Sequence, residues 1–381
     1  MDMPHHGPTA LDGDHFQVVP EPGSNKLVIY LTATGAPPRI YNFWNAGNAV
    51  KTHRIFVNHR RSWYQQGVPG LGETVEETAR SIRAWADHLG VDEIYTVGGS
   101  MGGYGAVLFG CLLGARVLAF SWETELHFPA SRSEKLMDKG TVVTYPDLAP
   151  LIASTGIRVF TIFGERDAVD AYSLSRIFHL PTVQVKSMQQ VLHGPQNYLN
   201  KKGRLIPFLE AFVDNFDTIP DMPEFGGMLE RPRFAELFFQ THQMHAAKRW
   251  PEAIESGCEA LKILPTSDQC NWLVGEAYLG MKEPELAYPY FCAARCSGGT
   301  SIDFFMSHAN CLRHMDANKE ALQIYAQVVK KWPLQAKGHY GAGLSHLRLG
   351  DFGEASAAFK EAARLDPKNE TYRKRAKQYS R

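Results

Sequence analysis

Between residues 15 and 216, short runs of β-branched and aromatic residues alternate with longer amphipathic stretches. The runs predict strands over Lys26 to Leu31, His53 to Val57, Glu93 to Val97, Arg116 to Phe120, Ile157 to Phe163 and Thr182 to Lys186. The longer stretches predict helices over Glu73 to Leu89, Met101 to Leu113, Tyr172 to Phe178 and Leu205 to Phe216. This alternation is typical of an α/β domain with a mainly parallel sheet covered on both faces. We expect His15 to Val19 to add an antiparallel edge strand.

The alternation stops near residue 216. Residues 217–232 contain three prolines and a Gly-Gly pair, and they lack a period that would bury one face. Beyond them the pattern is helical to the end of the chain. The sequence therefore predicts an α/β domain over 1–216, a linker over 217–232 and an all-α domain over 233–381.

The helical part contains an internal repeat with a period of 34 residues. The repeat is defined by Ala253, Ala287, Ala321 and Ala355, with an aromatic residue four positions after each of the last three, Phe291, Tyr325 and Phe359. Prolines twelve positions after three of the alanines, Pro265, Pro333 and Pro367, share the period. This pattern resembles the tetratricopeptide repeat, a helix-turn-helix unit of the same length.

The resemblance predicts four repeat units, 234–267, 268–301, 302–335 and 336–369, followed by a polar capping helix over 370–381. The first unit departs from the family pattern at Thr241 and Gly257, and the second has Gly299 in place of the closing proline. Stacked repeats form a concave surface, which implies a protein partner. The alternative is that the repeats extend the first domain or hold an oligomer together.

Composition narrows the class of protein. The 381 residues carry 40 Lys and Arg against 40 Asp and Glu, and 44% are hydrophobic, which is typical of a globular chain. Zero net charge argues against a general nucleic-acid-binding surface. No apolar run approaches the length of a membrane span, and the first residues lack the features of a signal peptide, so we expect a cytoplasmic protein.

The six cysteines are spread over a long chain, and the sequence predicts reduced, buried thiols. Cys292 and Cys296 lie one helical turn apart. Because no second pair of ligands has suitable spacing, we interpret them as packing residues and expect no metal site.

The most informative stretch is Gly98-Gly99-Ser100-Met101-Gly102, which follows a predicted strand and opens a predicted helix. A Gly-x-Ser-x-Gly string in this context resembles the nucleophile elbow of the α/β-hydrolases. In that turn the serine hydroxyl stands clear of the sheet, and glycines are needed because a Cβ would collide across the turn. Ser100 is therefore the candidate nucleophile.

A serine nucleophile needs a histidine base and a carboxylate that orients it. Asp167, in a Gly-x-x-Asp turn after the strand that ends at Phe163, is our first choice for the acid; Asp170 and Glu165 are alternatives in the same loop. His193 follows the next strand, where the hydrolase resemblance puts the base. His179 and His127 are weaker candidates.

The remaining site predictions concern the oxyanion donors and the pocket. The backbone N–H of Met101 is the expected first donor, and Ala33 or Thr34 the second. Carboxyl ends of parallel strands face the ligand crevice. Residues expected there for substrate binding are Arg60, Arg61, Trp63, Tyr64 and Trp122.

The serine turn and the upstream Trp-Tyr-x-x-Gly loop are similar to bacterial serine hydrolases associated with surface polysaccharides and accessory secretion. This resemblance implies an esterase or deacylase that acts on an acyl ester, with acetylated carbohydrate as a candidate substrate and no metal or organic cofactor. One alternative is an acyltransferase with the same triad. The other is a catalytically silent scaffold for protein assembly.

Overall fold

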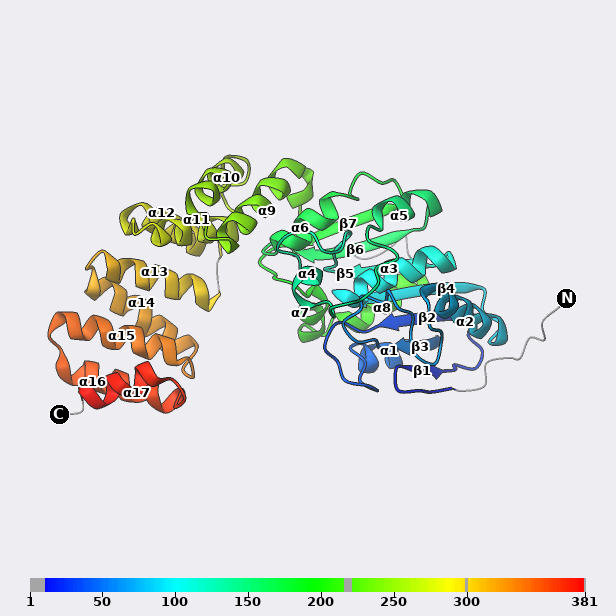
Figure 1. The fold of residues 1–381 in the computed structure, drawn as a ribbon, viewed down its shortest axis with the longest axis horizontal. Helices are drawn as coiled ribbons and strands as arrows, with labels where there is room; N and C mark the ends of the chain where they lie inside the picture. Colours follow the sequence, from blue (N-terminus) through cyan, green and yellow to red (C-terminus); the bar gives the residue numbers. More distant parts are fainter. Residues whose placement is uncertain (1–10, 216–220, 299–300, 380–381) are drawn as a thin grey trace. The chain divides into compact units, whose positions relative to one another are not determined.

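The structure is a computed structural model, and it describes residues 11–215, 221–298 and 301–379. The chain forms two compact units, Met1–Phe239 and Gln240–Arg381 (Figure 1). The division falls inside α9 (Pro232–Ala246). Of the predicted linker, 217–232, residues 217–220 lie outside the described residues; the rest contains the short strand β8 (Phe225–Gly226), the 3-10 turn Met228–Glu230 and the start of α9.

The first unit contains one eight-stranded sheet in the order β1-β3-β2-β4-β5-β6-β7-β8 (Figure 1). Six neighbouring strands pair in parallel, and only the edge strands β1 and β8 pair antiparallel to their neighbours. The predicted mixed α/β class and the antiparallel first strand are thus confirmed. The strands besides β8 are β1 (Phe16–Val19), β2 (Lys26–Leu31), β3 (His53–Val57), β4 (Glu93–Gly99), β5 (Arg116–Phe120), β6 (Val159–Gly164) and β7 (Val183–Met188).

Helices of the first unit connect the strands. Those that the sequence predicted are α2 (Val75–His88), α3 (Met101–Leu113), α6 (Ala168–Ser175) and α8 (Leu205–Asp214). The helix predicted over Tyr172 to Phe178 begins four residues earlier, because the Asp167 side chain caps its first turn by accepting from the Asp170 amide. Four short helices were not predicted, α1 (Trp44–Ala49), α4 (Arg132–Leu136), α5 (Ala149–Thr155) and α7 (Pro195–Lys201).

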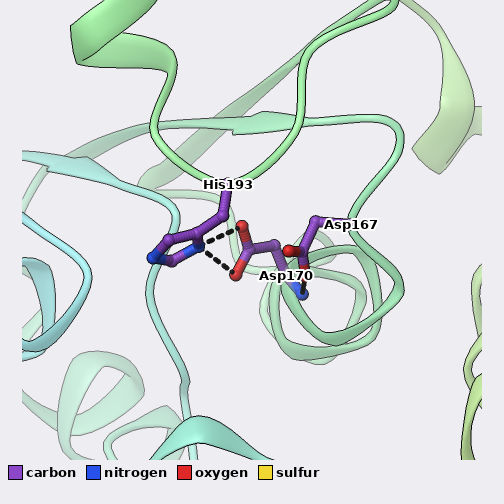
Figure 2. A group of neighbouring side chains, drawn as sticks. All are labelled: Asp167, Asp170 and His193. Atoms are coloured by element: carbon purple, nitrogen blue, oxygen red, sulfur yellow. Dashed lines mark hydrogen bonds and ion pairs between the residues drawn. The ribbon is translucent and has the colours of Figure 1, made fainter. Parts of the chain in front are cut away.

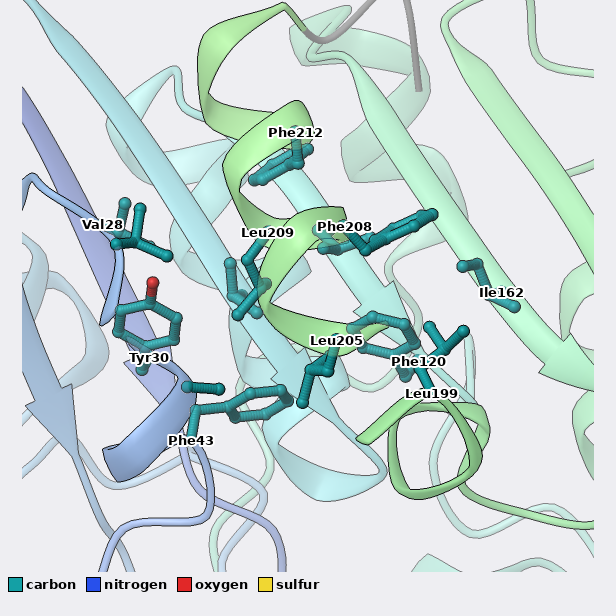
Figure 3. Close-up of a cluster of buried hydrophobic side chains, with 14 of the residues drawn as sticks. Val28, Tyr30, Phe43, Phe120, Ile162, Leu199, Leu205, Phe208, Leu209 and Phe212 are labelled. Carbon is teal, nitrogen blue, oxygen red and sulfur yellow. The ribbon is translucent and has the colours of Figure 1, made fainter. Parts of the chain in front are cut away.

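A large apolar core covers one face of the sheet (Figure 3). Helix α8 contributes Leu205, Phe208, Leu209 and Phe212, which recur at the spacing of one helical face. Phe208 packs against Phe120 and Phe160, with ring centroids 6.5 and 6.0 Å apart. The central strands are buried along nearly their whole length, which explains their continuous apolar sequence.

The turn from β4 into α3 depends on the absence of side chains at two positions. A Cβ at Gly98 would overlap the Gly102 carbonyl oxygen, and a Cβ at Gly102 would overlap the Leu31 carbonyl oxygen. The N-terminus of α3 therefore lies directly against the ends of β2 and β4.

The second unit consists of paired helices. They are α10 (Trp250–Ile263), which pairs with the end of α9, then α11 (Asp268–Gly280), α12 (Pro284–Cys296), α13 (Ile302–His314), α14 (Asn318–Lys331), α15 (Ala336–Leu349), α16 (Phe352–Leu365) and the final α17 (Glu370–Gln378). The repeat-defining residues are all completely buried: the four alanines and, after the last three, Phe291, Tyr325 and Phe359.

Gly275 and Gly343 occupy equivalent positions in two of the repeat units, and packing requires a small residue at both. A Cβ at Gly275 would lie 2.7 Å from the Phe291 ring, and one at Gly343 would lie 2.7 Å from the Phe359 ring. These two pairs of helices can therefore approach as closely as they do only because this position is glycine. The cysteines are free thiols, as predicted, but Cys296 is exposed and Cys258 and Cys292 are half-buried.

Among the described helices, none is both long and apolar enough to cross a bilayer.

We predict that Gly98→Ala lowers the free energy of unfolding of the first unit by about 3 kcal/mol or more, because its Cβ has no room in the turn. Gly114→Ala is the matched control: its Cβ meets open space, and only the positive φ of 65° opposes it, at about 1 kcal/mol. Urea unfolding measures both. Equal losses for the two variants would contradict the steric account.

Candidate functional site

Ser100 stands at the junction of β4 and α3 in a backbone conformation that few non-glycine residues adopt. Its φ is 56° and its ψ is −124°. Its amide donates to the Phe120 carbonyl oxygen at 2.8 Å, which ties the turn to the neighbouring strand β5. Strain of this kind persists only where the surroundings enforce it, and it occurs often at functional sites.

His193 lies in the loop between β7 and α7, and its ring contacts the carboxylate of Asp170 on α6 (Figure 2). The His193 Nδ1 atom is 2.9 Å from Asp170 Oδ2 and 3.2 Å from Oδ1. The Asp170 side chain is completely buried, whereas that of His193 is 27% exposed. A buried carboxylate that binds Nδ1 orients the ring and leaves Nε2 for another partner.

The prediction that Asp167 orients the histidine is wrong, because the carboxylate that contacts His193 Nδ1 is that of Asp170. Its Oδ1 accepts the Asp170 amide at 3.0 Å and so caps α6. The Asp167 Oδ2 atom accepts from the Arg132 guanidinium. Because the capping role fixes Asp167 one turn before the carboxylate that contacts His193, Asp170 is the acid of this pair.

Electrostatics favour ionised Asp170 beside a basic histidine. Burial acts to raise the pKa of Asp170, but the charges of His193 and Arg132 outweigh burial and hold that pKa below its ordinary value. Burial likewise acts to lower the pKa of His193, but the Asp170 carboxylate outweighs it and raises that pKa. The pair therefore stabilises an imidazolium next to a carboxylate.

A narrow hollow joins the serine turn to the histidine loop. Its lining brings together Trp63, Ser100, Met101, Ser121, Trp122, Glu123, Arg132 and His193. Ser100 and His193 thus face the same space, from the carboxyl ends of β4 and β7.

The predicted substrate-binding residues divide into two sets. Trp63 and Trp122 line the hollow. Tyr64 does not line it: its side chain is buried and its hydroxyl donates to the Thr32 carbonyl oxygen at 2.8 Å. Arg60 and Arg61 are exposed and lie outside its lining.

Only one of the predicted oxyanion donors lines the hollow. Met101 lines the hollow at the first position of α3, where a backbone N–H has no acceptor within the helix. The Ala33 amide donates to Asn42 Oδ1 at 2.6 Å, and neither Ala33 nor Thr34 belongs to the lining. Of the expected donors, Met101 alone lines the hollow.

The alternative acid and bases lie elsewhere. Glu165 accepts from the Ser187 hydroxyl at 2.7 Å. His179 is exposed, and neither it nor His127 belongs to the lining of the hollow.

Two polar residues of the site were not predicted from the sequence, Ser121 and Arg132. They belong to the connection after β5, where α4 has only five residues and hence no detectable period. Their signal was their position, because the carboxyl end of a parallel strand leads into the crevice.

Asp167, Asp170 and His193 could also hold a metal ion, since each offers a ligand atom within 4.8 Å of the others. The Arg132 guanidinium, however, already contacts one oxygen of each carboxylate. A metal ion would have to displace this cation.

Comparisons with known proteins identify helical repeats in the chain. Residues 317–370 match the family model described as tetratricopeptide repeat. One similar solved structure is MamA, which is 14% identical with a TM-score of 0.37; the match covers 39% of this chain and 80% of that one. Another is YrrB, described as a TPR protein with an unusual peptide-binding site, which is 16% identical with a TM-score of 0.38; the match covers 56% of this chain and 93% of that one. A third is the TPR domain of Arabidopsis OM64, which is 20% identical with a TM-score of 0.29; the match covers 29% of this chain and 93% of that one. No curated protein matches the chain. The C-terminal region thus carries tetratricopeptide repeats.

We predict that the His193 imidazole titrates above pH 6.5 in the native protein, because Asp170 raises its pKa. In Asp170→Asn the midpoint should fall below that of the wild type, since burial then acts without the opposing charge. NMR of protein labelled with ¹³C at histidine Cε1 measures both, and His193→Asn assigns the signal. An unchanged midpoint in Asp170→Asn would contradict the assigned pair.

Proposed function

We propose that the first unit is a serine esterase or deacylase of the α/β-hydrolase type. The observation that carries the proposal is the contact of His193 with the buried Asp170 carboxylate, because His193 faces the same hollow as Ser100. The strained serine turn between β4 and α3 supports it. So does the chain order, in which the carboxylate follows β6 and the histidine follows β7 of a mainly parallel sheet.

In the proposed reaction His193 takes the proton of the Ser100 hydroxyl while the serine oxygen attacks the acyl carbonyl. Asp170 stabilises the imidazolium that forms. The Met101 N–H, at the positive end of α3, stabilises the oxyanion of the tetrahedral intermediate. His193 then returns the proton to the departing alcohol. Water, activated by the same histidine, attacks the acyl-enzyme, and an acid leaves.

The hollow supports a short acyl group as the substrate. The hollow is narrow, and two indole rings, those of Trp63 and Trp122, form part of its wall. Flat aromatic faces with a polar edge also suit a sugar ring. We therefore propose an acetyl ester, on a carbohydrate alcohol, as the first substrate class to test.

We also propose that the tetratricopeptide repeats bind a protein partner. Their repeated helix pairs and the family match over 317–370 support this role. A purely scaffolding chain would have the same repeats but would not need a buried carboxylate to orient a histidine beside a strained serine.

We predict that Ser100→Ala lowers kcat for a short acyl ester such as 4-nitrophenyl acetate by about 10⁵-fold, because no nucleophile remains. Ser154→Ala is the matched control: Ser154 is exposed on α5, its hydroxyl donates to a helical carbonyl, and its loss should leave turnover unchanged. Undiminished turnover by folded Ser100→Ala protein would refute the mechanism. Acetate released from an acetylated sugar, rather than acetyl transferred to added sugar, separates hydrolysis from acyl transfer.

The two neighbouring aspartates should behave differently. We predict that Asp170→Asn lowers kcat by on the order of 10³–10⁴-fold, since the imidazole loses its orienting carboxylate. Asp167→Asn should change kcat less than about tenfold, because asparagine also caps helices. Steady-state kinetics with one ester tests both, and a larger loss in Asp167→Asn would reverse the assignment.

A further inference from the structure

Arg132 belongs to the unpredicted helix α4, and its side chain reaches the hollow that Ser100 and His193 line. The start of α4 is held by buried groups. Ser131 caps it by accepting the Glu134 amide, and Glu123 accepts the amides of Arg132 and Ser133. Arg132 thus projects from a fixed backbone, and its side chain is only 22% exposed.

The guanidinium of Arg132 joins the two aspartates of α6. Its Nη1 donates to Asp170 Oδ1 at 2.9 Å, and its Nη2 donates to Asp167 Oδ2. The other oxygen of Asp170, Oδ2, lies 2.9 Å from His193 Nδ1. Oδ1 of Asp170 thus accepts from Arg132 and also lies 3.2 Å from His193 Nδ1, so the carboxylate is held between the guanidinium and the imidazole.

The same charges act on the imidazole in opposite directions. Burial acts to lower the pKa of His193, the Asp170 carboxylate raises it, the Arg132 charge lowers it, and the more distant Asp167 raises it. Glu123 is the remaining carboxylate beside Arg132, with its Oε1 4.0 Å from Nη1. Burial raises the pKa of Glu123.

We infer that Arg132 is a positioning residue: its guanidinium, bonded to both Asp170 and Asp167, holds Asp170 in the orientation that faces His193 and places a positive charge beside the base. The role of Arg132 in catalysis depends on the proposed serine hydrolase function. The effect of the Arg132 charge on the pKa of His193 does not depend on that function. Without Arg132, the base would be protonated, and hence inactive, over a wider range of pH.

The test is the titration of His193, followed by NMR of protein labelled with ¹³C at histidine Cε1. Arg132→Gln should raise the midpoint by about one pH unit, because a positive charge leaves the site. Asp167→Asn keeps the helix cap but removes a negative charge, so the midpoint should fall. Arg132→Lys should titrate close to the wild type.

Arg176→Gln is the matched control. Arg176 is a partly buried arginine at the end of α6 that pairs with Asp147 and Glu125 and does not line the hollow. Its loss should not move the His193 midpoint. A merely structural role for Arg132 would change stability without producing shifts of opposite sign in Arg132→Gln and Asp167→Asn.

An unchanged midpoint in folded Arg132→Gln, or an equal shift in Arg176→Gln, would overturn the inference. If Arg132→Gln does not fold, Asp167→Asn decides, and an unchanged or raised midpoint there would overturn it. Turnover of 4-nitrophenyl acetate, measured against pH, tests the role of Arg132 in catalysis. In Arg132→Gln, kcat should fall 10- to 100-fold while KM changes little. Arg132→Lys should recover part of this loss in kcat. Absence of Ser100-dependent turnover in the wild type would refute the proposed function and leave the titration to decide on Arg132.

Discussion

The first unit depends on the close approach of α3 to the ends of β2 and β4. Gly98 and Gly102 permit it, because a Cβ at either position would overlap a backbone carbonyl oxygen across the turn. In this turn Ser100 has a positive φ, and Met101, the first residue of α3, lines the hollow. The Ser100 amide also donates to the Phe120 carbonyl oxygen, which ties the turn to β5.

Charges organise the rest of the site. Asp170 is completely buried, and a buried carboxylate is stable as an ion only when cations or donors surround it. His193 and Arg132 supply them from two different connections, the loop after β7 and the helix α4. The arrangement joins three segments that are distant in sequence, so the geometry of the base depends on all of them.

The sequence predicted the sheet well because buried parallel strands are continuously apolar: β2, β3 and β5 have the expected bounds. It predicted the repeats because a fixed period of 34 residues requires the same packing in every unit. Asp167 was chosen over Asp170 because both lie in one loop. Only the cap of α6, visible once the helix is known to begin at Ala168, separates their roles. Arg132 could not be found because a five-residue helix has no period.

The central claim is that Ser100 is activated as a nucleophile by the Asp170–His193 pair. Reaction of the purified protein with a fluorophosphonate, followed by peptide mass mapping, tests it without knowledge of the substrate. The account predicts one adduct per chain, on Ser100, that forms far more slowly in His193→Ala. A folded protein that remains unmodified, or an adduct on another serine, would contradict it.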